Sequence, residues 1–374
     1  MKRLVYLDNS ATTPLDKEVF EAMRPYFSDK FGNASTLYRL GLESRKAIED
    51  AREKVARAIN ANPDEIYFTS GGTESNNLII KSFDSVLTSS IEHPAVLNTC
   101  RLRKNWEIVN VDKKGYIDLE EFKRKLTSKT ELVSIMHSNN EIGTIQQISK
   151  IHKICQEKNI PLHTDAVQSF GKIKLDCKDF EMLSLSAHKI YGPKGVGAVY
   201  IKNSEKNKIK ALLIGGGQEQ GMRSGTENVP GIVGLGKATE IALKNMNKEN
   251  LRISKLRDQL KKKILNDIKN CWVNGGDERL PGNIHFRFKG LEGEALILML
   301  DEYGICASTG SACSSKLLKS SHVLSAIGLK PEESHGSLRI TVGKQNTKDD
   351  IDYVCKILPK VVERLRSISS EYRR

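Results

Sequence analysis

The sequence predicts an α/β protein built on a doubly wound, mostly parallel sheet, followed by a smaller α+β part. Two observations carry this prediction. From about residue 62 to residue 199, short apolar segments bounded by turn formers alternate with amphipathic runs such as residues 148–157. After Pro281 the pattern changes to a compact mixture of strand-like and helix-like segments. We therefore expect two domains.

Six short apolar segments are predicted as strands of the large sheet. They cover residues 66–69, 85–88, 132–136, 161–165, 182–186 and 197–201. A charged, helix-compatible run over residues 232–269 is predicted to link the two domains. Beyond it we expect a strand at 283–288, a helix at 292–303, a Gly/Ser/Cys loop, a helix at 322–327, a strand at 337–342 and a helix at 348–365.

Size and composition are those of an ordinary globular protein. The chain has 374 residues, 39% of them hydrophobic and 6% aromatic, which is enough for two domains and a substantial core. Residues 1–8 read as a first strand because they lack the apolar stretch and cleavage site of a signal peptide. No apolar run approaches the ~18 residues of a membrane span. We expect a cytoplasmic protein without a membrane partner.

Charge and cysteine content exclude several classes of partner and site. The net charge of +13 comes from 59 basic and 46 acidic residues, yet no nucleic-acid-binding motif accompanies it, so direct nucleic-acid binding is not expected. The seven cysteines are scattered without a C-x-x-C pair. This argues against a disulfide framework and against a resident metal site.

An aspartate and a lysine follow two neighbouring predicted strands. Asp165 ends the segment Pro161-Leu-His-Thr-Asp165, and Lys189 follows Leu183-Ser-Leu-Ser-Ala-His188. Pyridoxal phosphate needs this pairing: a lysine holds its aldehyde as a Schiff base, and a carboxylate keeps its ring nitrogen protonated. For an isolated pair, a buried structural ion pair would explain the sequence equally well.

Further groups at predicted strand ends favour the cofactor. The segment Thr69-Ser-Gly-Gly-Thr-Glu74 follows a strand and opens a helix, so its amides and the Thr73 hydroxyl form an anion site suited to a phosphate. A plain glycine turn is the alternative. Additional candidates for the phosphate or the ring are Ser186, His188, Thr226, His93, Gln168 and the polar segment 139–143.

One cysteine lies in a loop of small residues. Cys313 stands in Thr309-Gly-Ser-Ala-Cys313-Ser-Ser315, a setting in which an exposed thiolate can act as a nucleophile. Taken alone, such a cysteine is more often incidental. Two other motifs are set aside: residues 231–237 resemble a phosphate-binding loop but lack its Ser/Thr, and residues 110–121 resemble a calcium loop but place Lys114 at a ligand position.

Taken together, these motifs resemble the cysteine desulfurases of the NifS/IscS type, within the class-V aminotransferase family of pyridoxal-phosphate enzymes. The resemblance runs from residue 6 to about residue 368. It rests on the ordered combination of the segments 69–77, 137–143, 163–169, 186–195, 215–226 and 311–313 with Arg339.

The resemblance implies fold type I, with a large domain of residues 14–250 and a small domain of residues 1–13 and 251–374. It also implies a homodimer in which the Thr226 loop reaches the phosphate of the neighbouring subunit. By the family pattern, Lys189 forms the covalent link to the cofactor, Asp165 pairs with its ring nitrogen and His93 stacks on its ring. Gln168 bonds the phenolic oxygen, and the phosphate is held by Gly72, Thr73, Ser186 and His188. Asn140 contacts cofactor or substrate, and Arg339 clamps the substrate carboxylate.

The implied reaction converts L-cysteine to L-alanine and leaves the sulfur on Cys313 as a persulfide. The expected acceptors are proteins such as an iron–sulfur cluster scaffold or a tRNA-thiolation protein, with a transient iron–sulfur contact at Cys313 left open. The alternative is another pyridoxal-phosphate reaction: selenocysteine lyase, β-elimination or transamination. Cys313 speaks against simple transamination, which needs no nucleophilic thiol.

Overall fold

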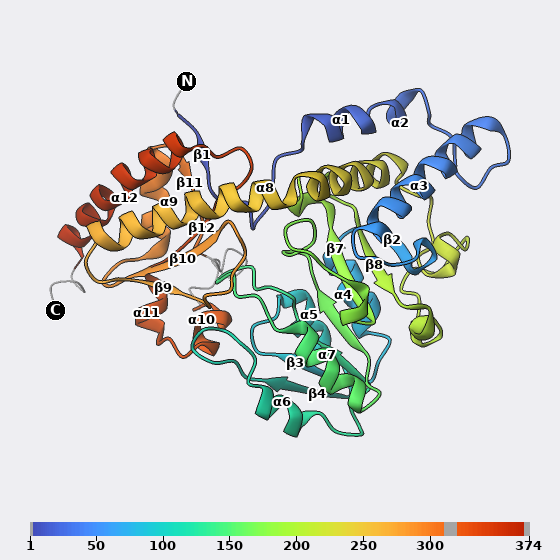
Figure 1. Cartoon of the computed structure of the whole chain (residues 1–374), viewed down its shortest axis with the longest axis horizontal. Coiled ribbons are helices and arrows are strands. Elements are labelled where there is room, and N and C mark those ends of the chain that lie inside the picture. Colours follow the sequence, from blue (N-terminus) through green and yellow to red (C-terminus); the bar gives the residue numbers. More distant parts are fainter. Residues whose placement is uncertain (1–2, 310–319, 370–374) are drawn as a thin grey trace.

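The structure is a computed structural model that describes residues 3–309 and 320–369 (Figure 1). Its largest element is a seven-stranded sheet with the strand order β2-β8-β7-β6-β5-β3-β4. The strands are β2 (Ile66–Thr69), β3 (Ser85–Ser89), β4 (Asn105–Val109), β5 (Leu132–Ser134), β6 (Leu162–Asp165), β7 (Met182–Ser186) and β8 (Gly197–Ile201). The pairs from β4 through β7 are parallel, and β8 is antiparallel to both of its neighbours. The predicted fold class is confirmed.

Alternating side chains cover both faces of this sheet. Ile66 and Phe68 belong to one buried cluster, whereas Tyr67 between them belongs to another on the opposite face. The first cluster includes residues of α3 (Arg39–Arg57), α7 (Ile148–Glu157) and α8 (Val229–Asp267), and the second includes residues of α4 (Gly72–Ile80) and α5 (Pro94–Cys100). Helices on both faces explain why every residue of β2, β6, β7 and β8 is buried.

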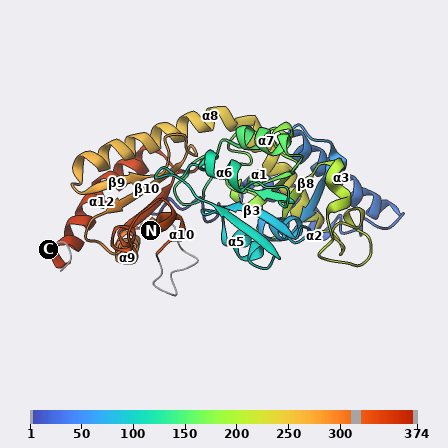
Figure 2. The ribbon, with the colours of Figure 1, turned by 90° about the horizontal axis from the view of Figure 1, so that it is seen from below.

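A separate buried cluster surrounds a second, three-stranded antiparallel sheet of order β12-β10-β9 (Figure 2). Its strands are β9 (Cys271–Asn274), β10 (Asn283–Phe288) and β12 (Ser337–Thr341). Residues of α9 (Gly293–Glu302) and α12 (Lys348–Ile368) belong to this cluster, and α11 (Pro331–His335) lies beside β10. Val323 and Leu324 of α10 (His322–Ala326) instead pack with Ile91 and Met136 in a separate cluster. The N-terminal strand β1 (Val5–Tyr6) pairs in parallel with β11 (Ile305–Cys306), so the chain begins beside this second sheet.

Helix α8 connects the cluster around Ile66 with the cluster of the second sheet. It is 39 residues long and runs across the molecule in Figure 1. Near its start, Ile232 and Leu235 pack into the cluster around Ile66, and near its end Leu260 and Ile264 pack into the cluster of the second sheet. The charged run predicted as a helix over residues 232–269 is thus a helix over residues 229–267.

Several elements differ from the sequence prediction. The strands β4 and β9 and the helices α1 (Lys17–Met23), α2 (Pro25–Ser28), α3, α5 and α11 were not predicted individually, whereas α6 (Leu119–Lys125) was expected after the turn of the calcium-like segment. Strand β5 ends two residues earlier than expected, and residues 305–306 form a strand instead of a loop. The calcium-like segment is a turn before α6, in which Asp112 accepts the amides of Lys114 and Tyr116. Among the helices of the described ranges, none combines the length and apolarity needed to cross a membrane.

Helices α3 and α8 touch so closely that a methyl group added at Gly236 would lie 2.7 Å from Cβ and 2.8 Å from Cα of Ala51. We expect Gly236→Ala to lower the free energy of unfolding by about 1–2 kcal/mol, because overpacking outweighs the ~1 kcal/mol of added helix propensity. Lys244→Ala, at an exposed position of the same helix, is the control. Urea unfolding of both variants measures the difference. A Gly236→Ala protein more stable than the native one would contradict this contact.

Candidate active site

The carboxyl ends of the parallel strands bring the predicted cofactor residues together. Strand β6 ends at Asp165, and its neighbour β7 ends at Ser186, with Asp165 opposite Ser184 in the register. A single 3₁₀ turn over Ala187–Lys189 then carries the lysine past the strand end. Ligands of such sheets bind at this edge.

The Asp165 carboxylate is buried and fixed by two hydrogen bonds. Its Oδ2 accepts from Nδ2 of Asn76 at 2.7 Å, and its Oδ1 accepts from the amide of Val167 at 3.0 Å. Asn76 lies in α4, and the sequence prediction did not name it as a site residue. These bonds hold the carboxylate in one orientation. A carboxylate that has to contact a ring nitrogen needs such a fixed orientation.

The Lys189 ammonium faces the N-terminal segment of the chain. Its Nζ donates to the carbonyl oxygens of Ser10 at 2.5 Å and Ala11 at 2.8 Å. Gln168 donates from Nε2 to the same Ser10 carbonyl at 3.0 Å, while its Oε1 is buried without a hydrogen-bond partner in the described structure. Ser10 and Ala11 are contacts of the site that the sequence prediction did not name.

Two histidines near this group are held neutral. His93 is the N-cap of α5, where its Nδ1 accepts the amide of Ala95 at 3.1 Å, so the proton of the neutral ring resides on Nε2. Burial lowers the pKa of His93, although the nearby Asp165 carboxylate opposes that shift. Burial lowers the pKa of His188 to about 4, with the Lys189 ammonium adding to the effect. Neutral rings are suited to stacking and hydrogen bonding.

The start of α4 offers a cradle for an anion. Gly71, with φ of 148°, turns the chain from β2 into this nine-residue helix, and Gly72 is its first residue. A Cβ at Gly72 would lie 2.5 Å from Cγ2 of Val167, so a larger residue would close the approach to the sheet edge. Ser186 lies next to Gly71, with its Oγ 3.7 Å from where a Cβ of Gly71 would stand. Thr73 is exposed in the first turn.

Arg339, from β12 of the second sheet, reaches the same region. Its buried guanidinium donates from Nη2 to Oδ1 of Asp8 at 2.7 Å and from Nη1 to the carbonyl of Asn140 at 3.0 Å. The Nε group is buried without a hydrogen-bond partner in the described ranges. The predicted bidentate grip on a substrate carboxylate therefore requires Asp8 to release Nη2.

Cys313 lies outside the described residues, but both flanks of its segment reach the site. On one side, Ser308 exchanges backbone hydrogen bonds with Arg339. On the other side, Ser321 donates from Oγ to Oε2 of Glu141 at 2.6 Å, and Nε2 of His322 donates to the carbonyl of Glu92 at 2.8 Å. Glu92 and Glu141 are the chain neighbours of His93 and Asn140.

Thr226 is exposed in a loop over residues 216–226, and in the described structure no hydrogen bond joins it to the Asp165–Lys189 group. The loop is held to the large sheet by a buried ion pair. Both Nη atoms of Arg52 donate to the Glu219 carboxylate at 2.8 Å, and the amide of Phe68 donates to the same carboxylate at 2.7 Å. A second pair joins Arg223 to Glu74 of α4 at 3.0 Å.

Comparison with known proteins agrees with this geometry. Residues 5–354 match the model of the family described as Aminotransferase class-V. The cysteine desulfurase IscS of Dictyoglomus turgidum is 49% identical over 99% of this chain and 97% of its own, and that of Methanosarcina thermophila is 48% identical over 99% and 96%. The chain belongs to the cysteine desulfurase branch of the class-V aminotransferases. The resemblance seen in the sequence is confirmed.

Solved structures of this family share the fold. A NifS-like protein superimposes with a TM-score of 0.90 at 37% identity, covering 98% of this chain and all of its own. A NifS-like protein from Rickettsia africae gives a TM-score of 0.89 at 33% identity, covering 96% of this chain and all of its own. These likenesses support fold type I for the chain.

The residues at the sheet edge fit the cofactor of the class-V aminotransferases, pyridoxal phosphate. A lysine, a fixed carboxylate and a helix start with glycines at the approach provide the three kinds of contact that the aldehyde, the ring nitrogen and the phosphate need. The buried and unpartnered Oε1 of Gln168 marks a polar side chain whose hydrogen bonding is incomplete without a further group.

Arg52, which holds the loop that carries Thr226, contacts two carboxylates: the buried one of Glu219 in the loop and the exposed one of Glu49. Replacing each of them in turn gives a matched pair of substitutions. We expect Glu219→Ala to cost about 3–5 kcal/mol of unfolding free energy, since it leaves the Arg52 charge buried without its main partner. Glu49→Ala removes the exposed partner and should cost less than about 1 kcal/mol. Denaturant unfolding compares the two. Equal losses would show that Glu219 does not anchor the loop.

Proposed function

We propose that the protein is a cysteine desulfurase: it takes L-cysteine, releases L-alanine and carries the sulfur on Cys313 as a persulfide. The observation that carries this proposal is the placement of Lys189 beside the fixed Asp165 carboxylate at the ends of β7 and β6. The support from sequence is full-length identity of 49% to a protein named cysteine desulfurase IscS.

Bound pyridoxal phosphate supplies an electron-accepting ring that makes the α-hydrogen of the amino acid acidic and weakens its C–S bond. Asp165 keeps the ring nitrogen protonated through a carboxylate that Asn76 and Val167 hold in place. Lys189 would hold the cofactor aldehyde, and its amine would take up the proton from the substrate α-carbon. His93, neutral and with its proton on Nε2, stacks on the ring.

The remaining predicted residues bind the phosphate, the phenolic oxygen and the substrate. The start of α4 with Gly72 and Thr73, together with Ser186 and His188, binds the phosphate, and Gln168 bonds the phenolic oxygen. Arg339 receives the substrate carboxylate beside Asn140, and that exchange moves the Asp8 carboxylate off Nη2. The charge-assisted bonds made to the substrate then replace the one that Asp8 gives up.

Cys313 completes the reaction as a nucleophile. Its thiolate attacks the sulfur of the bound cysteine, so that a new S–S bond forms as the C–S bond breaks. The electron pair of that bond goes to the substrate carbon, which takes up a proton and leaves as alanine. Neither an external oxidant nor a reductant is needed, and transfer of the outer sulfur to an acceptor thiol restores the Cys313 thiol; a reductant is consumed only when the sulfur is released as sulfide.

Two substitutions test this assignment. Lys189→Ala should abolish the covalent cofactor absorbance and alanine formation, whereas Lys194→Ala, at a neighbouring exposed lysine, should keep both. Cys313→Ser should retain the covalent cofactor yet form alanine from L-cysteine at least about a hundredfold more slowly, because its hydroxyl is a poor nucleophile toward sulfur. Cys177→Ser is the matched control.

Sulfide and alanine are measured after adding L-cysteine and a thiol reductant. Full activity of Cys313→Ser would remove the persulfide step from the proposal. Turnover of L-selenocysteine but not of L-cysteine by the native protein would instead establish the alternative, a selenocysteine lyase. Pyruvate in place of alanine would indicate β-elimination.

We also propose that the protein works as a homodimer. Support comes from large apolar side chains that stand exposed in the N-terminal third and near the Thr226 loop: Phe20 (48% exposed), Phe27 (63%), Phe31 (68%), Leu37 (82%), Tyr38 (60%), Leu42 (47%) and Ile214 (90%). Large apolar side chains exposed in such number are typical of a chain that buries them at a subunit interface. In such a dimer, Thr226 of each subunit contributes to the phosphate site of the other.

Mixing two inactive variants tests this arrangement. Lys189→Ala lacks the covalent link, and Thr226→Asp places a negative charge against the phosphate of the neighbouring site. After the two variants are unfolded and refolded together, each mixed dimer contains one site with both native residues. We therefore expect about a quarter of native activity from random pairing in a twofold dimer. Activity no greater than the sum of the two separate variants would contradict a shared site.

The persulfide acceptor, the compartment and the domain boundaries belong to the same proposal. The family resemblance supports delivery to an iron–sulfur cluster scaffold or a tRNA-thiolation protein in the cytoplasm. The two buried clusters joined by α8 support a large domain of residues 14–250 and a small domain of residues 1–13 and 251–374.

A further inference from the structure

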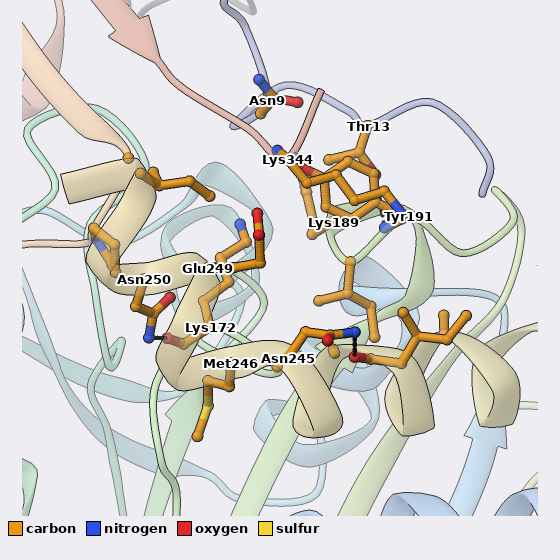
Figure 3. A pocket seen from close by; sticks show the side chains of 18 of the residues that line it. Asn9, Thr13, Lys172, Lys189, Tyr191, Asn245, Met246, Glu249, Asn250 and Lys344 are labelled. Carbon is orange, nitrogen blue, oxygen red and sulfur yellow. Dashed lines mark hydrogen bonds between the residues drawn. The ribbon is translucent and has the colours of Figure 1, made fainter. Parts of the chain in front are cut away.

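A cavity of about 500 Å³ lies behind Lys189, between the two buried clusters (Figure 3). Its walls come from α8, the N-terminal segment, the turn at residues 280–283 and the segment after β12. Lys189 and Ser10 line this cavity as well as the candidate active site, whereas Asp165, His93 and Arg339 do not line it. The cavity is thus a separate space that shares one wall with the active site.

Lys172 is the charged side chain of this cavity for which the described structure shows no oppositely charged partner. Its side chain is half-buried in the wall, and in the described part of the chain its ammonium makes no hydrogen bond or ion pair. Only its backbone carbonyl is engaged, by Nδ2 of Asn250 at 2.7 Å. Burial, together with the neighbouring Lys189 ammonium, lowers the pKa of Lys172 to about 7. The site therefore lacks an anion near Lys172.

The other charged side chains that line the cavity already have partners. Asp16 pairs with Lys344, and Lys189 donates to Ser10 and Ala11. Glu249, which Figure 3 shows on the same side as Lys172, pairs with Arg252 at 2.9 Å. Glu18, another lining residue, pairs with Lys237, with 3.6 Å between Oε2 of Glu18 and Nζ of Lys237. The Tyr191 hydroxyl accepts the amide of Lys344, and its pKa is raised to about 12 by burial, so it carries no charge.

The rest of the lining is largely apolar. It includes Ala238, Ile241, Ala242, Met246, Ile253, Leu280, Pro281 and Val342. A volume of about 500 Å³ falls in the ~300–1,000 Å³ range of small-molecule sites, which are mostly apolar with a few polar groups that orient the ligand. One unpaired cation at one wall and an apolar interior define the chemistry of the ligand.

We propose that this cavity is a second small-molecule site, which binds a carboxylate with an aliphatic body, its anionic end at Lys172 and its chain along α8. The binding site goes beyond the desulfurase reaction, since it uses neither Arg339 nor the sheet edge. Because Ser10 and Lys189 belong to both sites, an occupant of the cavity contacts the wall that holds the cofactor-linked lysine.

Octanoate is the probe, and 1-octanol is its uncharged counterpart. Titration calorimetry on the cofactor-loaded dimer should show octanoate binding at one site per chain and at least about tenfold weaker binding of octanol, since the ammonium interacts only with the anion. Affinity for octanoate should be nearly constant up to about pH 6 and fall by at least about fivefold from pH 7 to 8.5, because Lys172 of the empty site has a pKa of about 7 and loses its proton over this range.

Substitutions locate the probe. Lys172→Gln should weaken octanoate binding by about tenfold or more and remove its pH dependence, whereas Lys174→Gln, at an exposed neighbour, should change neither. Ala238→Met, which fills the cavity without changing its charge, should also weaken binding. Arg339→Lys should leave octanoate binding intact, which separates this site from the substrate carboxylate site.

Thermal unfolding checks that the Lys172→Gln protein is folded. The unfolded state keeps the lysine protonated up to its ordinary pKa, whereas the folded state releases the proton near pH 7. The native lysine therefore destabilises the fold below that ordinary pKa, and the variant should have the higher Tm at pH 7, with a gap that closes as pH rises. Octanoate binding that survives Lys172→Gln, or that is lost in Arg339→Lys alone, overturns the proposal.

Discussion

The register of β6 against β7 is the constraint on which the site depends. Asp165 lies opposite Ser184 in this parallel pair, so the last side chain of β6 and the turn after β7 emerge at the same edge. A slip of one residue would turn Asp165 toward the opposite face of the sheet. Burial opposes that slip, because Leu162 and Leu183 pack into the cluster around Ile66 and the buried His163 ring is hydrogen-bonded to Ser134 and Ser184. Core packing thereby sets the distance between a carboxylate and a lysine.

The N-terminal segment couples the two halves of the site. Asn9 and Ser10 are hydrogen-bonded to Thr341 of β12, and the Ser10 carbonyl accepts from both Lys189 and Gln168. Two residues earlier, Asp8 pairs with Arg339. A short stretch of chain thus connects the proposed substrate-binding arginine on one sheet with the proposed cofactor-binding lysine on the other. Movement of either sheet relative to the other would therefore change the contacts of both Arg339 and Lys189.

The sequence predicted the elements whose pattern is local. Six of the seven strands of the large sheet are short apolar runs, and α7 and α8 have helical patterns, so these elements were found within a few residues of their bounds. Strand β4 was missed because it is an edge strand: of residues 105–109 only Val109 is buried, so the alternation is weak. Helix α3 was missed because its buried face includes Gly41, Ser44 and Arg52, which do not read as a hydrophobic stripe.

The candidate site was predictable where a residue ends a strand, as for Asp165 and Lys189. Contacts made at long range were not predictable. Asn76 lies 89 residues from Asp165, and Glu219 lies 167 residues from Arg52, so no local pattern relates them. The Lys172 cavity is a property of how α8 and the N-terminal segment meet, and the lysine itself reads as an ordinary charged residue in the sequence.

The central claim is that Lys189, and no other lysine, bonds to the cofactor. Borohydride reduction of the purified protein followed by peptide mass spectrometry tests it directly, because reduction makes the link permanent. Our account predicts one phosphopyridoxyl group per chain, on the peptide that contains Lys189. Modification of Lys172 instead, whose pKa of about 7 also gives it a neutral amine, would contradict the account, as would a reduced protein without any adduct.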